Sequence, residues 1–286
     1  MSKSFLSVLS GSFSTPADDN PTVAMMEAAY AAAGLDARYV NCDVASADLA
    51  DAIIGARAMG WVGFNCSMPH KVAVIDHLDG LGESAELIGA VNCVVARDGG
   101  LIGENTDGRG FVEALRELRH PGGTHVVVLG AGGAGRAIAI EMALAGAGHI
   151  TIVNRSVGRA ESLATLVAER TDAEADFRPW TSAYAVPASA DVVVNATSVG
   201  LGDAEALIDI DLDSLRPDLL VADVIPNPPH TAYLRAAAQR GAQTLDGLGM
   251  LVAQGAVAIE LWHGVSPNRD VMRARLSEVL GLETTN

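Results

Sequence analysis

The chain has 286 residues, of which 49% are hydrophobic and only 4% aromatic, so its core must consist mainly of Ala, Val, Leu and Ile. Its 35 acidic and 19 basic side chains give a formal net charge of −16, which argues against nucleic-acid or anionic-membrane binding, since both need basic surfaces. The length favours two domains, and three cysteines are too few for a disulfide scaffold and suit a reducing cytoplasm.

The first hundred residues alternate short apolar runs with helical patterns. Strands are predicted at residues 5–9, 37–40 and 62–65. A helix is predicted to start at Pro21, with Asn20 as its N-cap and Gly34 as its stop, and a second helix to cover residues 46–59. A β-hairpin is predicted around Asp98-Gly99-Gly100, between residues 91–96 and 101–102.

A second unit is predicted from residue 108 onward. Its expected strands are residues 126–129, 150–153, 192–195 and 219–223, and its expected helices are residues 110–118, 134–145, 159–169, 231–240, 250–262 and 269–280. Such alternation predicts an α/β fold with a Rossmann-type, doubly wound nucleotide domain and an α/β substrate domain. No signal peptide or membrane span is expected, because the longest apolar stretch carries Arg136 and Glu141.

A glycine-rich turn follows the strand at residues 126–129 and opens a helix. Its residues, all predicted to bind cofactor, are Gly130, Ala131, Gly132, Gly133, Ala134 and Gly135. A glycine triplet between a strand and a helix predicts a dinucleotide site, because the backbone can approach a pyrophosphate and the helix N-terminus faces it. The alternative is a glycine-rich turn without a ligand.

The end of the following strand indicates which dinucleotide binds. An NAD site places a carboxylate there for the ribose 2′-hydroxyl. This chain instead has Asn154, Arg155 and Ser156, with Arg159 one turn further on. Two guanidinium groups suit a 2′-phosphate, so we predict that these four residues bind NADP. Alternatively, the two arginines only lie at the start of a helix.

Five further motifs occur in the order found in the shikimate dehydrogenase family, which the chain resembles along nearly its whole length. They are Asn65-Cys66-Ser67-Met68-Pro69-His70-Lys71, Ile88-Gly89-Ala90-Val91-Asn92, Gly103-Glu104-Asn105-Thr106-Asp107-Gly108, Asn195-Ala196-Thr197-Ser198-Val199-Gly200 and residues 247–254. The resemblance implies an enzyme that interconverts 3-dehydroshikimate and shikimate, or a close hydroxy-cyclohexane carboxylate, with NADP. It also implies that residues 1–107 and 248–286 form the substrate-binding domain and residues 108–247 the NADP-binding domain.

The resemblance also implies roles for single residues. Lys71 and Asp107 match the acid–base pair that exchanges the hydroxyl proton. The matching substrate-binding residues are Asn65, Ser67, Asn92 and Gln254, and the matching residues near the cofactor are Thr197, Val224, Gly247 and Met250. Outside these motifs, Lys71 would be an ordinary surface lysine and Asp107 a helix cap.

The chain departs from the family where the substrate carboxylate is expected. The family has Ser-x-Ser-Pro before its first helix, whereas this chain has Asp18-Asp19-Asn20-Pro21. Carboxylates there would repel an anionic substrate, so we expect Ser12 and Ser14 to supply the hydroxyls if residues 16–20 loop out. The tyrosine that the family places between the Asp and the Asn-Pro of a later motif is also missing from residues 223–228.

Two alternatives remain at this stage. One is an NAD-dependent quinate or shikimate dehydrogenase, and the other is a non-catalytic NADP-binding sensor. The scattered histidines predict no metal site. The expected partner is a small-molecule substrate, and the sequence leaves the oligomeric state open.

Overall fold

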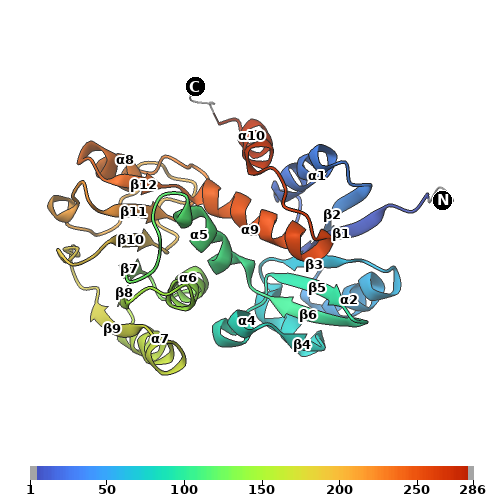
Figure 1. The fold of residues 1–286 in the computed structure, drawn as a ribbon, viewed down its shortest axis with the longest axis horizontal. Helices are drawn as coiled ribbons and strands as arrows, with labels where there is room; N and C mark the ends of the chain where they lie inside the picture. Colours follow the sequence, from blue (N-terminus) through green and yellow to red (C-terminus); the bar gives the residue numbers. More distant parts are fainter. Residues whose placement is uncertain (1–4, 283–286) are drawn as a thin grey trace. The chain divides into compact units, whose positions relative to one another are not determined.

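The structure is a computed structural model, and it describes residues 5–282. The chain divides into two compact units: unit 1 contains the residues up to Thr106 and those from Gly255 onward, and unit 2 contains Asp107–Gln254. The chain leaves unit 1 within helix α5 (Thr106–Arg116) and returns to it within helix α9 (Gly247–His263). Each unit is built around its own sheet, so the predicted α/β class is confirmed (Figure 1).

Unit 1 contains a mixed six-stranded sheet with the order β2-β1-β3-β5-β6-β4. Its strands are β1 (Val8–Ser14), β2 (Ala37–Asp43), β3 (Gly63–Cys66), β4 (Gly80–Leu81), β5 (Cys93–Arg97) and β6 (Gly100–Glu104). Strand β1 pairs in parallel with β2 and β3, whereas β3, β5 and β6 pair antiparallel. The hairpin β5–β6 is confirmed, and its turn has Asp98 at φ 52° and Gly99 at φ 81°, as a two-residue hairpin turn requires.

The helices of unit 1 are α1 (Thr22–Ala33), α2 (Leu49–Ala58), α3 (His70–Ala73), α4 (Glu83–Ile88) and α10 (Arg269–Val279), with 3-10 turns at Ser46–Asp48 and Val74–His77. Helix α1 confirms the predicted helix and its stop at Gly34, but it begins at Thr22 with Pro21 at the N-cap position, one residue later than the predicted cap Asn20. The Asn20 side chain accepts from the Thr22 amide at 3.1 Å, and Gly34 ends the helix at φ 66°. The hydrophobic core between the sheet and α2 consists of buried apolar side chains, among them Phe13, Phe64, Leu49 and Ile53.

Strand β1 differs from the strand predicted at residues 5–9. It begins at Val8 and continues to Ser14, while Phe5 and Leu6 are largely exposed. Its serines are buried, and two of them form hydrogen bonds within the fold: Ser10 with the Tyr30 hydroxyl at 2.7 Å and Ser12 with the Asn41 side chain at 2.8 Å. Alternating serines do not have the apolar periodicity on which the prediction relied.

Unit 2 contains a fully parallel sheet with the order β12-β11-β10-β7-β8-β9, the doubly wound arrangement of dinucleotide-binding domains. Its strands are β7 (His125–Leu129), β8 (His149–Asn154), β9 (Glu174–Pro179), β10 (Val192–Asn195), β11 (Leu220–Asp223) and β12 (Gln243–Leu245), and its remaining helices are α6 (Gly133–Leu144), α7 (Val157–Arg170) and α8 (Ala232–Gln239). The two edge strands β9 and β12 were not predicted. They lie at the sheet margins and are mostly not buried, so they lack the apolar runs of the central strands.

Buried tryptophans anchor both units. In unit 1 the Trp262 indole donates to the Val94 carbonyl at 2.9 Å, and a Cβ atom at Gly63 would lie 2.1 Å from this indole nitrogen. In unit 2 the Trp180 indole donates to the Asp209 carbonyl at 2.8 Å.

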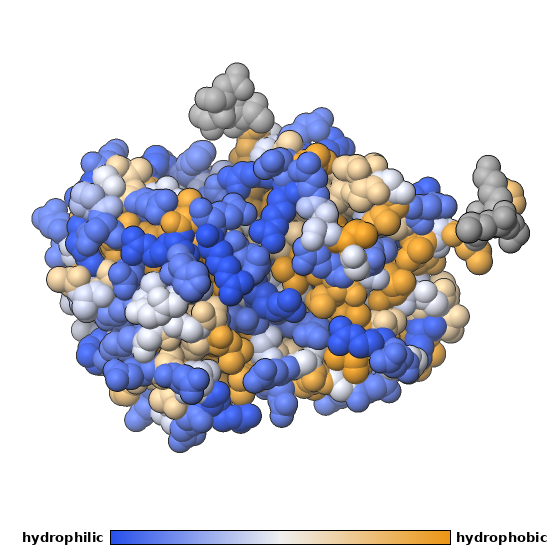
Figure 2. Space-filling model, in the orientation of Figure 1, coloured by the Kyte–Doolittle hydropathy of each residue, from blue (hydrophilic) through white to orange (hydrophobic). Residues whose placement is uncertain are grey.

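Hydrophilic residues predominate on the face drawn in Figure 2, with hydrophobic residues scattered among them. Within residues 5–282, no helix has both the length and the hydropathy of a membrane span.

Candidate active site

The glycine-rich turn lies at the carboxyl end of β7, where the strand order reverses. Gly130 has φ 111°, a conformation that favours glycine, and a Cβ atom on Gly135 would lie 2.0 Å from the Gly130 carbonyl oxygen. Cβ atoms at Gly132 and Gly133 would have no neighbour within 4 Å. Gly130 and Gly135 therefore allow the turn to pack closely against α6, whereas Gly132 and Gly133 leave the backbone open to a phosphate.

Asn154 connects the end of β8 to this turn. Its side-chain oxygen accepts from the Ala131 amide at 3.2 Å, and its side-chain nitrogen donates to the Ser156 carbonyl at 3.0 Å. The residue predicted to contact cofactor therefore also fixes the loop around it. No carboxylate stands here to hold a ribose 2′-hydroxyl, as an NAD site would need.

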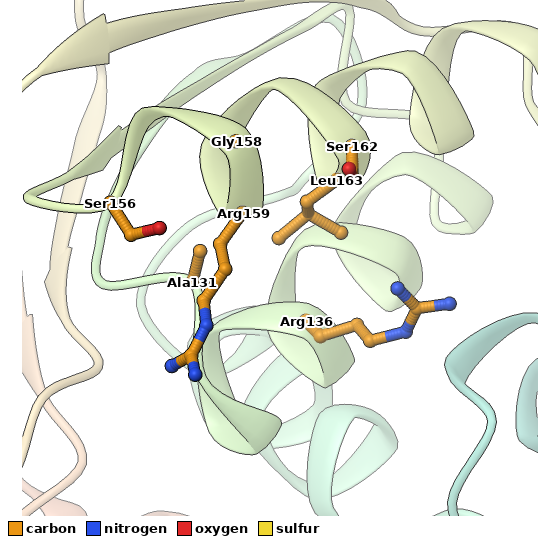
Figure 3. A pocket seen from close by; sticks show the side chains of 7 residues that line it. All are labelled: Ala131, Arg136, Ser156, Gly158, Arg159, Ser162 and Leu163. Atoms are coloured by element: carbon orange, nitrogen blue, oxygen red, sulfur yellow. The ribbon is translucent and has the colours of Figure 1, made fainter.

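A pocket of about 460 Å³ lies between the N-terminal ends of α6 and α7 (Figure 3). Its lining residues are Ala131, Arg136, Ser156, Gly158, Arg159, Ser162 and Leu163. The Arg159 side chain extends from α7 toward Ala131, whereas Arg136 is directed away from it, and Arg155 is not among the lining residues. Arg155 and Arg159 are exposed, and neither forms an ion pair with any residue that the structure describes. Free guanidinium groups in such an acidic chain suit an anionic ligand.

A hydrogen-bond network joins the carboxyl ends of β10 and β11. The Asn195 side chain accepts from the Thr197 hydroxyl at 2.7 Å and donates to Asp223 at 3.0 Å. Asp223 also accepts from the Ile225 amide at 3.2 Å and from the Thr231 hydroxyl at 2.7 Å. Burial raises the pKa of the Asp223 carboxyl to about 6, although hydrogen bonds from Thr231, Ile225, Asn195 and Val224 act in the opposite direction.

The other residues expected near the cofactor lie close to this hydrogen-bond network. A Cβ atom at Gly130 would lie 3.0 Å from the Thr197 methyl group, and one at Gly247 would lie 2.5 Å from the Val224 carbonyl carbon. Asp246 accepts from the Gly249 amide at 2.8 Å and caps the start of α9, on which Met250 is buried. Unit 2 therefore brings Gly130, Thr197, Val224 and Gly247 to one edge of its sheet. Gln254 lies later on α9, where its side chain donates to the Leu251 carbonyl at 3.0 Å.

A row of polar side chains crosses the first sheet near the carboxyl ends of its parallel strands. Ser12 on β1 stands opposite Asn41 on β2 and Asn65 on β3. The Ser12 hydroxyl donates to Asn41 at 2.8 Å, and Asn65 accepts from the Tyr39 hydroxyl at 2.8 Å and donates to the Asn92 carbonyl at 3.0 Å. Sequence reasoning missed Asn41 and Tyr39, for which the only signal was their place on a strand.

Asn92 holds the start of α5. Its side-chain oxygen accepts from the Thr106 amide at 2.6 Å, and its side-chain nitrogen donates to the Thr106 hydroxyl at 3.0 Å. Asp107 is the next residue of this helix and belongs to unit 2. The predicted substrate ligand Asn92 therefore also fixes the backbone next to the predicted acid–base residue.

Lys71 lies on the short helix α3 in unit 1, after Ser67, whose carbonyl accepts from the His70 amide at 2.8 Å. The His70 ring is fully buried and bonded to the Val44 carbonyl at 2.8 Å, so it anchors α3 to the fold. Burial raises the pKa of the Cys66 thiol to about 12, and the positive charge of Lys71 partly offsets this rise. Lys71 is one of only two lysines in the chain, the other being Lys3, whereas all other basic residues are arginines.

The connection between β1 and α1 carries the departure from the family motif. Asn20 donates to the Ser12 hydroxyl at 3.4 Å, and its carbonyl accepts from Asn41 at 2.9 Å. Ser12 and Ser14 are 1% and 3% exposed, and the Ser14 hydroxyl oxygen is enclosed without a partner among the described residues. Asp18 and Asp19 are exposed.

The fold and the glycine-rich turn define a two-unit, dinucleotide-binding α/β protein. Three family descriptions match the chain: the shikimate dehydrogenase substrate binding domain at residues 13–94, shikimate/quinate 5-dehydrogenase at residues 113–201, and the shikimate 5′-dehydrogenase C-terminal domain at residues 247–276. A shikimate dehydrogenase (NADP(+)) from Desulforamulus reducens is 40% identical over 268 residues, 92% of each chain.

Two solved structures extend the comparison. A ligand-free 5-ketofructose reductase of Gluconobacter sp. strain CHM43 is 56% identical, covers 96% of this chain and 100% of that one, and has a TM-score of 0.95. A shikimate dehydrogenase in complex with NADP+ is 36% identical, covers 96% of both chains and has a TM-score of 0.86. The chain belongs to the shikimate dehydrogenase family, which confirms the resemblance and the expected class of enzyme, an oxidoreductase acting on a CH–OH group.

Proposed function

We propose that this protein is an NADP-dependent oxidoreductase that interconverts a ketone and a secondary alcohol on a polyhydroxylated substrate. Residues 108–247 bind NADP, and residues 1–107 together with 248–286 bind the substrate. The observation that carries the cofactor assignment is that Arg155 and Arg159 have no ion-pair partner among the described residues, and that Arg159 lines the pocket next to Ala131. The relatives named for NADP support the same assignment.

The residues of unit 2 fit this cofactor in chemical type. The open backbone at Gly132 and Gly133 suits the pyrophosphate, Ser156 and Arg159 suit the 2′-phosphate, and Thr197, Val224, Gly247 and Met250 suit the nicotinamide end. When bound, NADPH supplies the hydride that adds to the carbonyl carbon of the substrate, and NADP+ accepts it in the reverse direction.

Lys71 and Asp107 form the proposed acid–base pair. In reduction, the Lys71 ammonium donates a proton to the carbonyl oxygen as it becomes a hydroxyl, and in oxidation the neutral amine takes that proton back. Asp107 is the carboxylate of this proposed pair. A lysine is suited to this role because an amine can release its proton, whereas the guanidinium of arginine stays charged. The chain uses arginine at nearly every other basic position.

The first substrate candidate is the pair 3-dehydroshikimate and shikimate. The curated relatives named shikimate dehydrogenase (NADP(+)) and the family descriptions support it. Asn65, Ser67, Asn92 and Gln254 would hold the ring hydroxyls with neutral donors and acceptors. The direction of flux follows from the supply of ketone and NADPH.

The second candidate is an uncharged polyhydroxy ketone such as 5-ketofructose. Two observations favour it: the 5-ketofructose reductase is 56% identical to this chain, and Asp18 and Asn20 stand between β1 and α1 where the family has two serines. In both candidates the reaction consumes one ketone, one NADPH and one proton and yields one secondary alcohol and one NADP+.

Steady-state kinetics with purified protein test the proposal. We expect NADPH to be oxidised with at least one of the two ketones, and NADP+ to be preferred to NAD+ in the reverse reaction. Tight NADPH binding without turnover on either ketone would instead support the non-catalytic sensor. A preference for NAD+ with quinate would support a quinate dehydrogenase.

A further inference from the structure

The connection between β1 and α1 points to the substrate class. We infer that the substrate is an uncharged polyhydroxy ketone, not a carboxylate, and that Asp18 and Asn20 determine this choice. The inference rests on the proposed function, since it concerns the substrate of the same site. It is argued from the hydrogen bonds of Ser12, the position of Asn20 and the charge of Asp18.

The serines of β1 are already engaged or enclosed. The Ser12 hydroxyl has one hydrogen, which it donates to Asn41, and it accepts from Asn20 in addition. Ser14 has its hydroxyl oxygen enclosed within unit 1. A carboxylate could use Ser12 only after its hydrogen bonds with Asn41 and Asn20 were broken, and it could reach the Ser14 hydroxyl only if the residues that enclose it moved. Ser12 and Ser14 are therefore poor carboxylate ligands, which favours residues 18–20 as the part of the connection that meets the substrate.

Asn20 has a fixed place beside the polar row of the first sheet. Its side-chain oxygen accepts from the Thr22 amide at 3.1 Å, and its carbonyl accepts from Asn41 at 2.9 Å. The side-chain amide donates toward Ser12 with one hydrogen, which leaves its second hydrogen for a ligand. Asn20 is half-buried, so this donor stands at the margin of the sheet and not in its core.

Asp18 supplies the opposite kind of group. Its carboxylate is exposed and has no hydrogen-bond or ion-pair partner among the described residues. An ionised carboxylate only accepts hydrogen bonds, so it suits a hydroxyl donor and repels a second carboxylate. A hydroxyl can donate to Asp18 and accept from Asn20, whereas a carboxylate can only accept. The pair therefore matches a polyol and discriminates against an acid.

The comparisons agree with this chemistry. The relative that is named for 5-ketofructose, an uncharged sugar ketone, shares more identical residues with this chain than the shikimate dehydrogenases described above. Identity alone does not assign a substrate. The replacement of the two family serines by Asp18 and Asn20 gives a physical reason for a different substrate, which sequence identity alone does not give.

The test compares kcat/KM for 5-ketofructose and for 3-dehydroshikimate with NADPH. We expect the wild-type protein to prefer 5-ketofructose by about tenfold or more. The double variant Asp18→Ser, Asn20→Ser restores two hydroxyls before Pro21, and we expect it to lower that ratio by about tenfold or more. A serine at position 20 can still accept from the Thr22 amide, so this hydrogen bond at the start of helix α1 is kept.

Two controls make the result specific. Asp51→Ser removes the same charge from an exposed position on α2 and is expected to leave the ratio unchanged. Asn20→Ser alone keeps the charge of Asp18 and is expected to change the ratio less than the double variant. Thermal unfolding and NADPH binding of every variant identify any that has failed to fold.

Each outcome decides one point. A wild-type preference for 3-dehydroshikimate would overturn the inference and leave the proposed function intact. Reduction of neither ketone would overturn the proposed function instead. A preference for 5-ketofructose that the double variant does not alter would overturn the assignment to Asp18 and Asn20.

Discussion

At the scale of single residues, the acid–base proposal concerns one amine. Lys71→Ala is expected to lower kcat by roughly 10²–10⁴, the usual contribution of a positioned acid–base group, while NADPH binding stays near that of the wild type. Lys71→Arg separates charge from proton transfer, because it keeps a cation that cannot release its proton. We expect this variant to lose a similar factor. Near-full kcat in either variant, measured with the preferred ketone, would remove Lys71 from the chemistry.

Arg155 and Arg159 make a prediction about cofactor choice. Arg159 lines the pocket beside Ala131, so Arg159→Ala should lower the ratio of kcat/KM for NADP+ to that for NAD+ by about tenfold. Arg155→Asp should act in the same direction, since it adds a repelling carboxylate where NAD sites have their acid. Arg170→Ala, at the other end of α7, is the matched control and should leave the ratio unchanged. If only one of the two arginines alters the ratio, that residue alone contacts the 2′-phosphate.

At the scale of elements, the end of β11 predicts a pH-dependent stability. The pKa of Asp223 is about 6 in the folded protein and 3.8 ordinarily. The protonated Asp223 carboxyl therefore stabilises the folded protein in full below pH 3.8, and this stabilisation is lost as the pH rises through 6. Between about pH 5 and about pH 8 the loss amounts to roughly 1.4 kcal/mol. Asp223→Asn keeps an acceptor for Asn195 and Ile225 but does not titrate.

Urea unfolding at several pH values measures this effect. We expect the free energy of unfolding of the wild type to fall, relative to that of Asp223→Asn, as the pH rises over this range. Parallel curves for the two proteins would show that another group carries the pH dependence.

The elements that the sequence predicted are those whose signals are local. The strand before Gly130 is a continuous apolar run, and helix α1 ends at Gly34 in the left-handed conformation that glycine favours. Strand β1 was misplaced because its serines are buried by hydrogen bonds to residues about 20 to 29 positions away. Such partners are set by the sheet order, which no local pattern contains.

The same distinction holds for the candidate site. Motifs containing Lys71 and Gly130 were found because their spacing within one segment is informative. Asn41 and Tyr39 were missed because each gains its role only across neighbouring strands, from Ser12 and Asn65. The role of Asn154 in fixing the glycine-rich turn was also not predicted, because its hydrogen bond with the Ala131 amide joins the ends of two strands, β7 and β8.

At the scale of the whole molecule, cofactor binding should stabilise the fold selectively. A ligand that binds only the native state adds about 2.7 kcal/mol at a concentration one hundred times its Kd. We expect NADP+ to raise the midpoint of thermal unfolding more than NAD+ at equal concentration. Arg159→Ala should narrow this difference, and Arg170→Ala should not. Equal shifts with both nucleotides would contradict the proposed 2′-phosphate contact.

The buried tryptophans give each unit its own spectroscopic label. Trp61 and Trp262 belong to unit 1, whereas Trp180 belongs to unit 2, and all three are 8% exposed. Their intrinsic fluorescence should shift to longer wavelength as each indole meets water. A Trp180→Phe protein would then emit only from unit 1, and a protein with both Trp61 and Trp262 replaced by Phe would emit only from unit 2. Denaturation followed in these two proteins would reveal whether the halves of the chain melt together or in succession.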